Sequence, residues 1–245
     1  MIVQSDGWLK SDDGSAKVVH CPSVRTTAML TARPLALVWH ATGGVGGPGF
    51  ADGLARRIQT YRRGIDRAAS WHLLIARDSG HVYQSAPLMV GTWHVGRPGS
   101  IAGTRYQNIN GVTIGVELEN AGELVHVRGH YYAYPYWLDK AERKPDPKLL
   151  VHPARVRIFE GRAYDDFTQA QAASATQLVA ALSKHFGWGP SEFLHDHAEF
   201  AAPVKTDPGP IWMKRILPHV LSEALTDNGR TGVTAAPDFV TTPRS

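Results

Sequence analysis

The chain has 245 residues, of which 43% are hydrophobic and 20% charged, so it can bury a core and is not disordered throughout. The single cysteine, Cys21, excludes an intramolecular disulfide and a zinc site closed by several thiolates. The formal charge of +4 and the pI of about 9.2 suit contact with an anionic polymer. The basic residues are scattered, however, and no nucleic-acid-binding motif accompanies them, so we expect no nucleic-acid partner.

No segment approaches the roughly 18 consecutive apolar residues of a membrane-spanning helix, so we expect no membrane insertion. The first residues, Met1 to Trp8, lack the basic and apolar regions of a classical signal peptide. We therefore expect synthesis in the cytoplasm, and action either there or elsewhere after release or export.

Residues 1–34 carry turn signals and are expected to be irregular. Beyond them, short apolar runs predict four strands, at residues 35–42, 70–78, 81–85 and 113–120. A turn at Ser79-Gly80 joins the second strand to the third. The glycines of residues 42–49 predict a loop that borders a site, and residues 52–69 predict a helix.

The second half of the chain predicts an excursion followed by helices. Residues 121–165 are rich in aromatic, proline and charged residues without a long apolar period, which indicates an insertion. Thr168 and Gln171 form a capping-box signal for a helix that Gly187 ends. A short helix over 211–225, interrupted at Pro218, precedes a disordered tail at 226–245. The order of elements predicts one α/β domain, residues 1–225, with a central mixed sheet flanked by helices.

The most informative residues are His40, at the end of the first long strand, and the pair His197 and Asp207, ten residues apart. Two imidazoles and one carboxylate are three zinc ligands that leave the fourth position open, as in catalytic rather than structural zinc sites. The pattern indicates hydrolysis at a single Zn²⁺. His195 lies two residues before His197 and is the alternative second imidazole.

Three sequence blocks resemble the zinc-dependent N-acetylmuramoyl-L-alanine amidases of the type 2 class, which share a fold with peptidoglycan recognition proteins. The blocks are Val38-Trp-His40, Thr113-Ile-Gly-Val-Glu117-Leu-Glu119, and His197 with Lys205-Thr-Asp-Pro-Gly-Pro210. The resemblance spans about residues 35–215, and the Lys-Thr-Asp-Pro-Gly-Pro block is its most specific part. It implies an amidase-like fold and a peptidoglycan or muropeptide substrate.

The resemblance also implies roles for single residues. It favours His197 over His195 as the zinc ligand and makes Glu117 the general base, with Glu119 as the alternative. Lys205 would stabilise the oxyanion. Trp71 and His72 stand where some small phage amidases have a catalytic tyrosine, so this chain is expected to use the glutamate mechanism. With His94 and Arg105, they are the expected substrate-binding residues.

Alternatives to the wall amidase remain at this stage. A non-catalytic peptidoglycan-binding protein of the same fold is one, although such relatives lack a zinc ligand and this chain has all three. An enzyme for another amide is a second, because the 121–165 insertion would reshape the groove. A bacteriolytic phage lysin, a recycling enzyme and an exported effector all agree with the sequence, and its pI favours the lysin.

Overall fold

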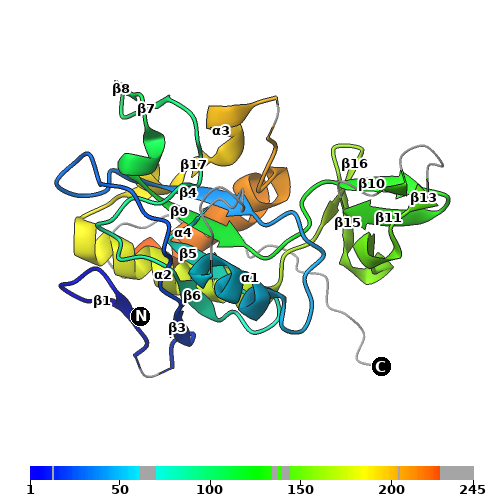
Figure 1. Ribbon diagram of the computed structural model, residues 1–245, viewed down its shortest axis with the longest axis horizontal. Helices are drawn as coiled ribbons and strands as arrows, with labels where there is room; N and C mark the ends of the chain where they lie inside the picture. The colour runs from blue at the N-terminus through cyan, green and yellow to red at the C-terminus, as the bar shows by residue number, and fades with distance from the viewer. Residues whose placement is uncertain (13, 61–69, 134–136, 140–143, 204, 227–245) are drawn as a thin grey trace.

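The computed structural model describes residues 1–226 except 13, 61–69, 134–136, 140–143 and 204 (Figure 1). At its centre lies a six-stranded mixed sheet in the order β17-β4-β9-β5-β6-β3. The strands are β3 (Val18–His20), β4 (Ala36–Ala41), β5 (Leu73–Ile75), β6 (Val82–Gln84), β9 (Thr113–Leu118) and β17 (His195–Asp196). The neighbouring strands β5 and β6 are antiparallel, and the other pairs in this sheet are parallel.

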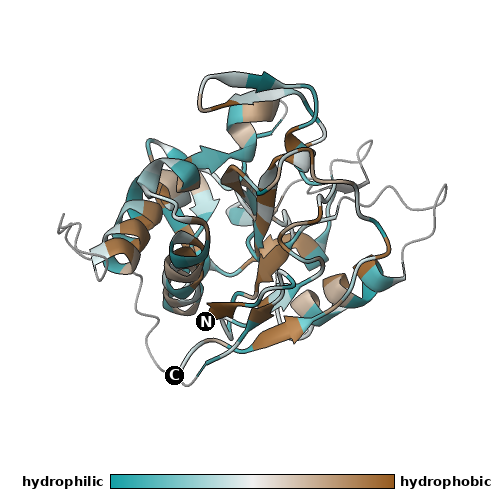
Figure 2. Cartoon of the chain, turned by 90° about the vertical axis from the view of Figure 1, so that its left-hand side faces the viewer, coloured by the Kyte–Doolittle hydropathy of each residue, from teal (hydrophilic) through white to brown (hydrophobic). Residues whose placement is uncertain are grey.

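Helices cover both faces of this sheet, which confirms the predicted α/β fold (Figures 1 and 2). The helices α2 (Gln169–Phe186) and α4 (Leu217–Thr226) pack together on one face, and the π-helical turn η5 (Ile211–Ile216) leads into α4. The helix α1 (Phe50–Gln59) packs on the other face through Ala51, Ala55 and Ile58.

Alternation along the buried strands decides which side chains face which layer. Trp39 of β4, Val116 of β9 and Leu73 of β5 belong to the core beneath α2 and α4. The next residues along these strands, His40, Glu117 and Leu74, are paired in register across the sheet. They therefore lie side by side on the opposite face, and two of the three carry polar chemistry.

The boundaries of α2 follow from local backbone chemistry. Thr168 Oγ1 accepts a hydrogen bond from the Gln171 amide at 3.2 Å, and the Gln171 side chain accepts one from the Thr168 amide at 3.2 Å. This is the capping box that the sequence predicts. The helix ends at Gly187, whose φ of 71° is left-handed and suits glycine.

Residues 121–165 form a set of small antiparallel sheets beside the main sheet (Figure 1). Their strands are β10 (Leu124–Val127), β11 (His130–Ala133), β12 (Trp137–Asp139), β13 (Lys144–Pro145), β14 (Leu150–Val151), β15 (Val156–Phe159) and β16 (Arg162–Asp165), with 3-10 turns η2 (Pro147–Leu149) and η3 (Pro153–Arg155). A buried ion pair joins this insertion to the segment that follows β5, because Asp165 lies 3.3 Å from Arg77. A second ion pair, between Asp165 and Arg155 at 2.6 Å, lies within the insertion.

The remaining elements are short: β1 (Ile2–Val3), β2 (Leu9–Lys10), β7 (Gly99–Ile101), β8 (Thr104–Tyr106), and the turns η1 (Ile109–Gly111), η4 (Pro190–Phe193) and α3 (His197–Ala201). The expectation of irregular structure over 1–34 was wrong in part, because β1 and β2 pair and β3 joins the main sheet beside β6. The helix predicted over 52–69 begins earlier, at Phe50. Residues 61–69 and, from the predicted tail, 227–245 lie outside the described residues.

The predicted interruption at Pro218 corresponds to a change of helix type rather than to a break. The π-helical turn ends at Ile216, and the α-helix begins at Leu217, so Pro218 lies in the first turn of α4. The Leu217 amide donates to the Trp212 carbonyl in the wider π-helical pattern, and the helical run continues into α4 although Pro218 has no N–H to donate. Among the described helices, none is long and apolar enough to span a membrane.

Candidate metal centre

Strand pairing brings His40 and His197 together. The short strand β17 lies parallel to β4 with Asp196 opposite Trp39, so His197 follows at the level of His40. Asp196 then caps α3 by accepting a hydrogen bond from the Glu199 amide at 2.8 Å, which fixes the turn that begins at His197. The two imidazole rings lie 4.5 Å apart between centroids, and both side chains are buried.

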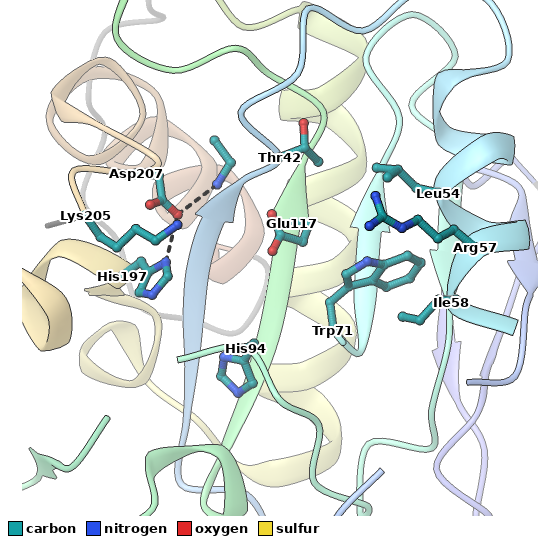
Figure 3. Close-up of a pocket in the computed structure, with 11 residues that line it drawn as sticks. Thr42, Leu54, Arg57, Ile58, Trp71, His94, Glu117, His197, Lys205 and Asp207 are labelled. Carbon is teal, nitrogen blue, oxygen red and sulfur yellow. Dashed lines mark hydrogen bonds and ion pairs between the residues drawn. The ribbon is translucent and has the colours of Figure 1, made fainter. Parts of the chain in front are cut away.

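Asp207 completes the group from the segment that follows α3. One carboxylate oxygen, Oδ2, lies 3.1 Å from His197 Nδ1 and 3.6 Å from His40 Nδ1. The Ala41 amide donates a hydrogen bond to the same oxygen at 3.3 Å, which ties this segment to the end of β4 (Figure 3). The ligand atoms of His40, His197 and Asp207 all lie within 4.8 Å of one another. Two nitrogens and an oxygen that converge in this way fit a zinc ion with an open position.

The protonation states around this group favour a cation. Burial lowers the pKa of His40 to about 4, against the opposing effect of Asp207, so the imidazole is neutral at pH 7. Burial alone would raise the pKa of Asp207, but its hydrogen bond with His197 at 3.1 Å opposes burial, and that pKa lies far below its usual range. Neutral imidazole and ionised carboxylate are the forms that bind metals.

A cavity of about 320 Å³ opens over these residues (Figure 3). Besides His197 and Asp207, it is lined by Ala41, Thr42, Leu54, Arg57, Ile58, Trp71, His94, Glu117 and Lys205. Trp71, Leu54 and Ile58 make one wall apolar, and the Arg57 side chain extends over this wall. A second cavity of about 380 Å³ shares Ala41, Thr42, Lys205 and Asp207 with the first, and it is also lined by the start of the insertion, including Glu123 and Val125.

Glu117 stands on β9 beside His40 and faces the cavity. Its Oε2 atom is shielded from solvent and, among the described residues, has no hydrogen-bond partner. Burial, and then the negative charge of Asp207, raise the pKa of this carboxyl to about 8, whereas Lys205 opposes the shift. An unpaired carboxyl is costly in such a place unless it is used. Glu117 is therefore positioned to exchange a proton with a molecule in the cavity.

Lys205 reaches the same cavity from the exposed segment before Asp207 (Figure 3). Its backbone amide donates to the Ala201 carbonyl at 3.2 Å, which anchors the segment to the end of α3. In Figure 3 the side chain extends toward Asp207 and His197, and its positive charge acts to lower the pKa of both Glu117 and His40. This position places a cation beside any anion that forms there.

Not all the residues expected to bind substrate reach the cavity. Trp71 and His94 line it, but His72 is completely buried: its Nε2 contacts the Val90 carbonyl at 2.7 Å, and its Nδ1 accepts from the Gly115 amide at 3.0 Å. Both ring nitrogens of His72 thus serve the fold. Arg105 is exposed on β8 and does not line the cavity.

The structure places the two alternative residues, His195 and Glu119, away from the candidate metal site. His195 pairs with Glu199 at 2.8 Å and is not part of the converging group. Glu119 accepts hydrogen bonds from the amides of Gly47 and Arg77, both at 3.0 Å, and lies outside the cavity. Glu119 thereby holds the glycine loop of residues 42–49, in which a Cβ atom added at Gly46 would lie 2.6 Å from Glu119 Oε1.

The sequence did not indicate Arg57, Leu54 or Ile58 as cavity residues. The basic residues are scattered, and no sequence signal distinguishes Arg57 from its neighbour Arg56. Only the packing of α1 against Trp71 and Leu74 turns one of these two arginines toward the cavity.

Comparison with known proteins identifies the family. The sequence profile described as N-acetylmuramoyl-L-alanine amidase matches residues 30–210, which is most of the chain. The chain belongs to this amidase family. The metal-binding group and Glu117 all lie within the matched region. No curated protein matches the chain.

Solved structures show similarity to the amidase chain at low sequence identity. A mutant endolysin from Bacillus subtilis is 18% identical, with 85% of this chain and 99% of that chain covered and a TM-score of 0.50. An AmpD selenomethionine derivative is 23% identical, with coverages of 86% and 93% and a TM-score of 0.49. The amidase AmiD from E. coli, solved with an anhydro-muropeptide substrate, is 22% identical, with coverages of 83% and 61% and a TM-score of 0.48. At this identity the endolysin supports the fold alone.

Proposed function

We propose that the chain is a zinc amidohydrolase that cleaves the amide bond between N-acetylmuramic acid and L-alanine in peptidoglycan or muropeptides. The observation that carries the proposal is the convergence of His40, His197 and Asp207 in one cavity with the unpaired Glu117 and with Lys205. Membership of the amidase family supplies the substrate class.

The three converging side chains would hold the metal and leave one position open. With zinc held by these residues, the site would supply a water with a pKa of ~7 and a Lewis acid for the substrate carbonyl. The ligand set suits this role because Asp207 supplies one negative charge and the two imidazoles supply none.

Two residues of the chain then have separate roles, Glu117 in proton transfer and Lys205 in stabilisation of negative charge. The positive charge of a bound cation would favour the ionised form of the Glu117 carboxyl. Its Oε2 would then take a proton from the attacking water and return it to the leaving nitrogen of L-alanine. Lys205 stabilises the negative charge that develops on the carbonyl oxygen, and a single donor of this kind contributes about 3–4 kcal/mol to the transition state. The apolar wall around Trp71 excludes water on one side, and the guanidinium of Arg57 offers a partner for a stem-peptide carboxylate.

The alternative is a protein that binds peptidoglycan without cutting it. The filled ligand set and the unpaired Glu117 carboxyl favour hydrolysis, because a purely binding protein gains nothing from a buried carboxyl that lacks a partner. The second cavity at the root of the insertion extends the surface on which a larger wall fragment would lie.

The test is mass spectrometry of two substrates after incubation with the protein, purified peptidoglycan and soluble anhydro-muropeptide. The proposal predicts release of stem peptides with a free L-alanine amine, loss of this release with a chelator, and its recovery with Zn²⁺. Binding of either substrate without any cleavage in the zinc-loaded protein would support the binding-only alternative. Preference for intact wall would favour a bacteriolytic, endolysin-like role over recycling.

A further inference from the structure

A series of hydrogen bonds connects the Ile109 carbonyl to the Nε2 atom of His40 through the side chains of Thr113 and His94. His40 Nε2 lies 3.0 Å from His94 Nδ1, and His94 Nε2 lies 3.2 Å from Thr113 Oγ1. The Thr113 hydroxyl in turn donates to the Ile109 carbonyl at 2.8 Å. His94 and Thr113 are buried, so solvent does not compete for these contacts.

The direction of each bond follows from its last member. The Thr113 hydroxyl has a single proton and gives it to the closer acceptor, the Ile109 carbonyl at 2.8 Å, so it accepts from His94 Nε2 at 3.2 Å. His94 then carries its proton on Nε2 and accepts at Nδ1, which requires the proton of His40 to sit on Nε2. The lone pair of His40 is consequently on Nδ1, the atom that lies 3.6 Å from Asp207 Oδ2.

Contacts other than the hydrogen bonds to His40 and Thr113 also fix the His94 ring, which is the middle member of this series. The His94 ring lies on Gly115 of β9, where an added Cβ would approach the ring to 2.4 Å. Asn110 Oδ1 accepts hydrogen bonds from the amides of His94 and Val95, at 2.9 and 2.8 Å. Both contacts hold the ring between Thr113 and His40.

We propose that Thr113 and His94 are positioning residues that hold His40 in the tautomer whose Nδ1 lone pair faces Asp207 and His197. His94 therefore acts through His40, although the sequence predicted it as a substrate-binding residue. Partners of this kind fix the ring orientation of metal ligands, and their loss typically lowers metal affinity by about 10–100-fold. The inference rests on the proposed zinc site, but the tautomer it assigns exists without the metal.

The first test uses paired variants and zinc affinity, measured by competition with a chromophoric chelator. Thr113→Val removes the hydroxyl at nearly constant volume and is expected to weaken zinc binding by about 10–100-fold. Thr113→Ser keeps the hydroxyl and is expected to bind zinc about as well as the wild type. A second pair follows the same logic: His94→Asn retains an acceptor near the position of Nδ1, whereas His94→Leu removes it. Equal zinc affinity within both pairs would overturn the proposal.

The second test needs no variant to fold and no zinc to bind. Long-range ¹H–¹⁵N NMR of the zinc-free wild-type protein reports which ring nitrogen of each histidine carries the proton. The proposal predicts protons on Nε2 of both His40 and His94. A proton on His40 Nδ1 would overturn the tautomer assignment even if zinc binds, whereas failure of the wild type to bind zinc would contradict the proposed function and leave this assignment intact.

Discussion

Around the candidate metal centre, the polar side chains stand on strands that pack through apolar neighbours such as Trp39 and Val116. Where the insertion joins the rest of the chain, at its root near residues 121 and 165, the charged side chains are themselves the buried contacts. His40 and Glu117 are aligned by β4 and β9, and the apolar residues beside them carry the packing. At the root, Asp165 is fully buried and is held by two arginines and by the Ala121 amide at 2.9 Å.

This difference predicts which substitutions change the function of the protein and which change its stability. Side chains at the metal centre can be replaced without loss of the apolar contacts that support the sheet, so their loss should change rate or metal binding. Side chains at the insertion root balance each other's charge, so their loss should change the free energy of unfolding.

The largest effect is expected at Glu117. Glu117→Gln removes the proton acceptor, and we expect kcat to fall by about 10²–10⁴-fold while zinc binding is retained. Steady-state kinetics with a soluble muropeptide and metal analysis of the same sample measure the two quantities. Near wild-type kinetics would place the base elsewhere.

The same substitution should stabilise the zinc-free protein in a pH-dependent way. Because the folded-state pKa of Glu117 is raised from 4.5 to about 8, the folded protein holds a proton that the unfolded chain releases. The stability that this group contributes is complete below pH 4.5 and is lost as the pH rises toward 8. Glu117→Gln should therefore be more stable than the wild type by up to about 3 kcal/mol at pH 7, and no more stable at pH 4. Thermal unfolding at both pH values tests this, with Glu160→Gln as an exposed control.

The next effect concerns the insertion root. Asp165→Ala leaves the buried Arg77 without its carboxylate, and we expect a loss of about 3–5 kcal/mol in unfolding free energy. Glu123→Ala is the matched control, because its contact with Arg162 is largely exposed and should cost less than about 1 kcal/mol. Denaturant unfolding compares them, and equal losses would show that burial of the charges does not decide stability here.

A smaller change in rate is expected at Lys205. Lys205→Ala should lower kcat by about 10²–10³-fold, because one donor to the oxyanion is lost. Its melting temperature should stay close to that of the wild type, since the side chain is exposed. Lys184→Ala, an exposed lysine on α2, controls for loss of charge alone. A fall in melting temperature without a fall in rate would assign Lys205 to the fold instead.

The smallest effect on catalysis should come from Glu119, which lies two residues after Glu117, just beyond the end of β9. Glu119→Gln leaves one of the Gly47 and Arg77 amides without its acceptor, at a cost of about 1–3 kcal/mol in stability. Because Glu119 lies outside the cavity, kcat should change little. A loss of rate as large as that of Glu117→Gln would mean that the glycine loop takes part in catalysis.

The sequence predicts the features of the fold that depend on interactions between residues close together in the chain. The capping box at Thr168, the hairpin of β5 and β6, and the buried strands β4 and β9 follow from local pattern, and all are present. The strand β3 has only three residues, which are too few for a pattern that the sequence reveals. Its position depends instead on pairing with β6, a strand distant in the sequence.

The same limit applies to the candidate site. The ligand residue types are visible in the sequence, but the choice between His195 and His197 depends on the register of β17 against β4. His72 and His94 both follow a tryptophan, and the sequence does not distinguish them. Their different positions arise from contacts with Gly115 on a strand far along the chain, where the amide of Gly115 binds one ring and the missing side chain makes room for the other.

The most direct test of the account is the zinc content of three proteins purified alike: the wild type, His197→Ala and His195→Ala. The account predicts one zinc per chain in the wild type, almost none in His197→Ala, and most of the metal retained in His195→Ala, because His195 pairs with Glu199 and does not converge with His40 and Asp207. Full zinc in His197→Ala together with an empty site in His195→Ala would contradict it.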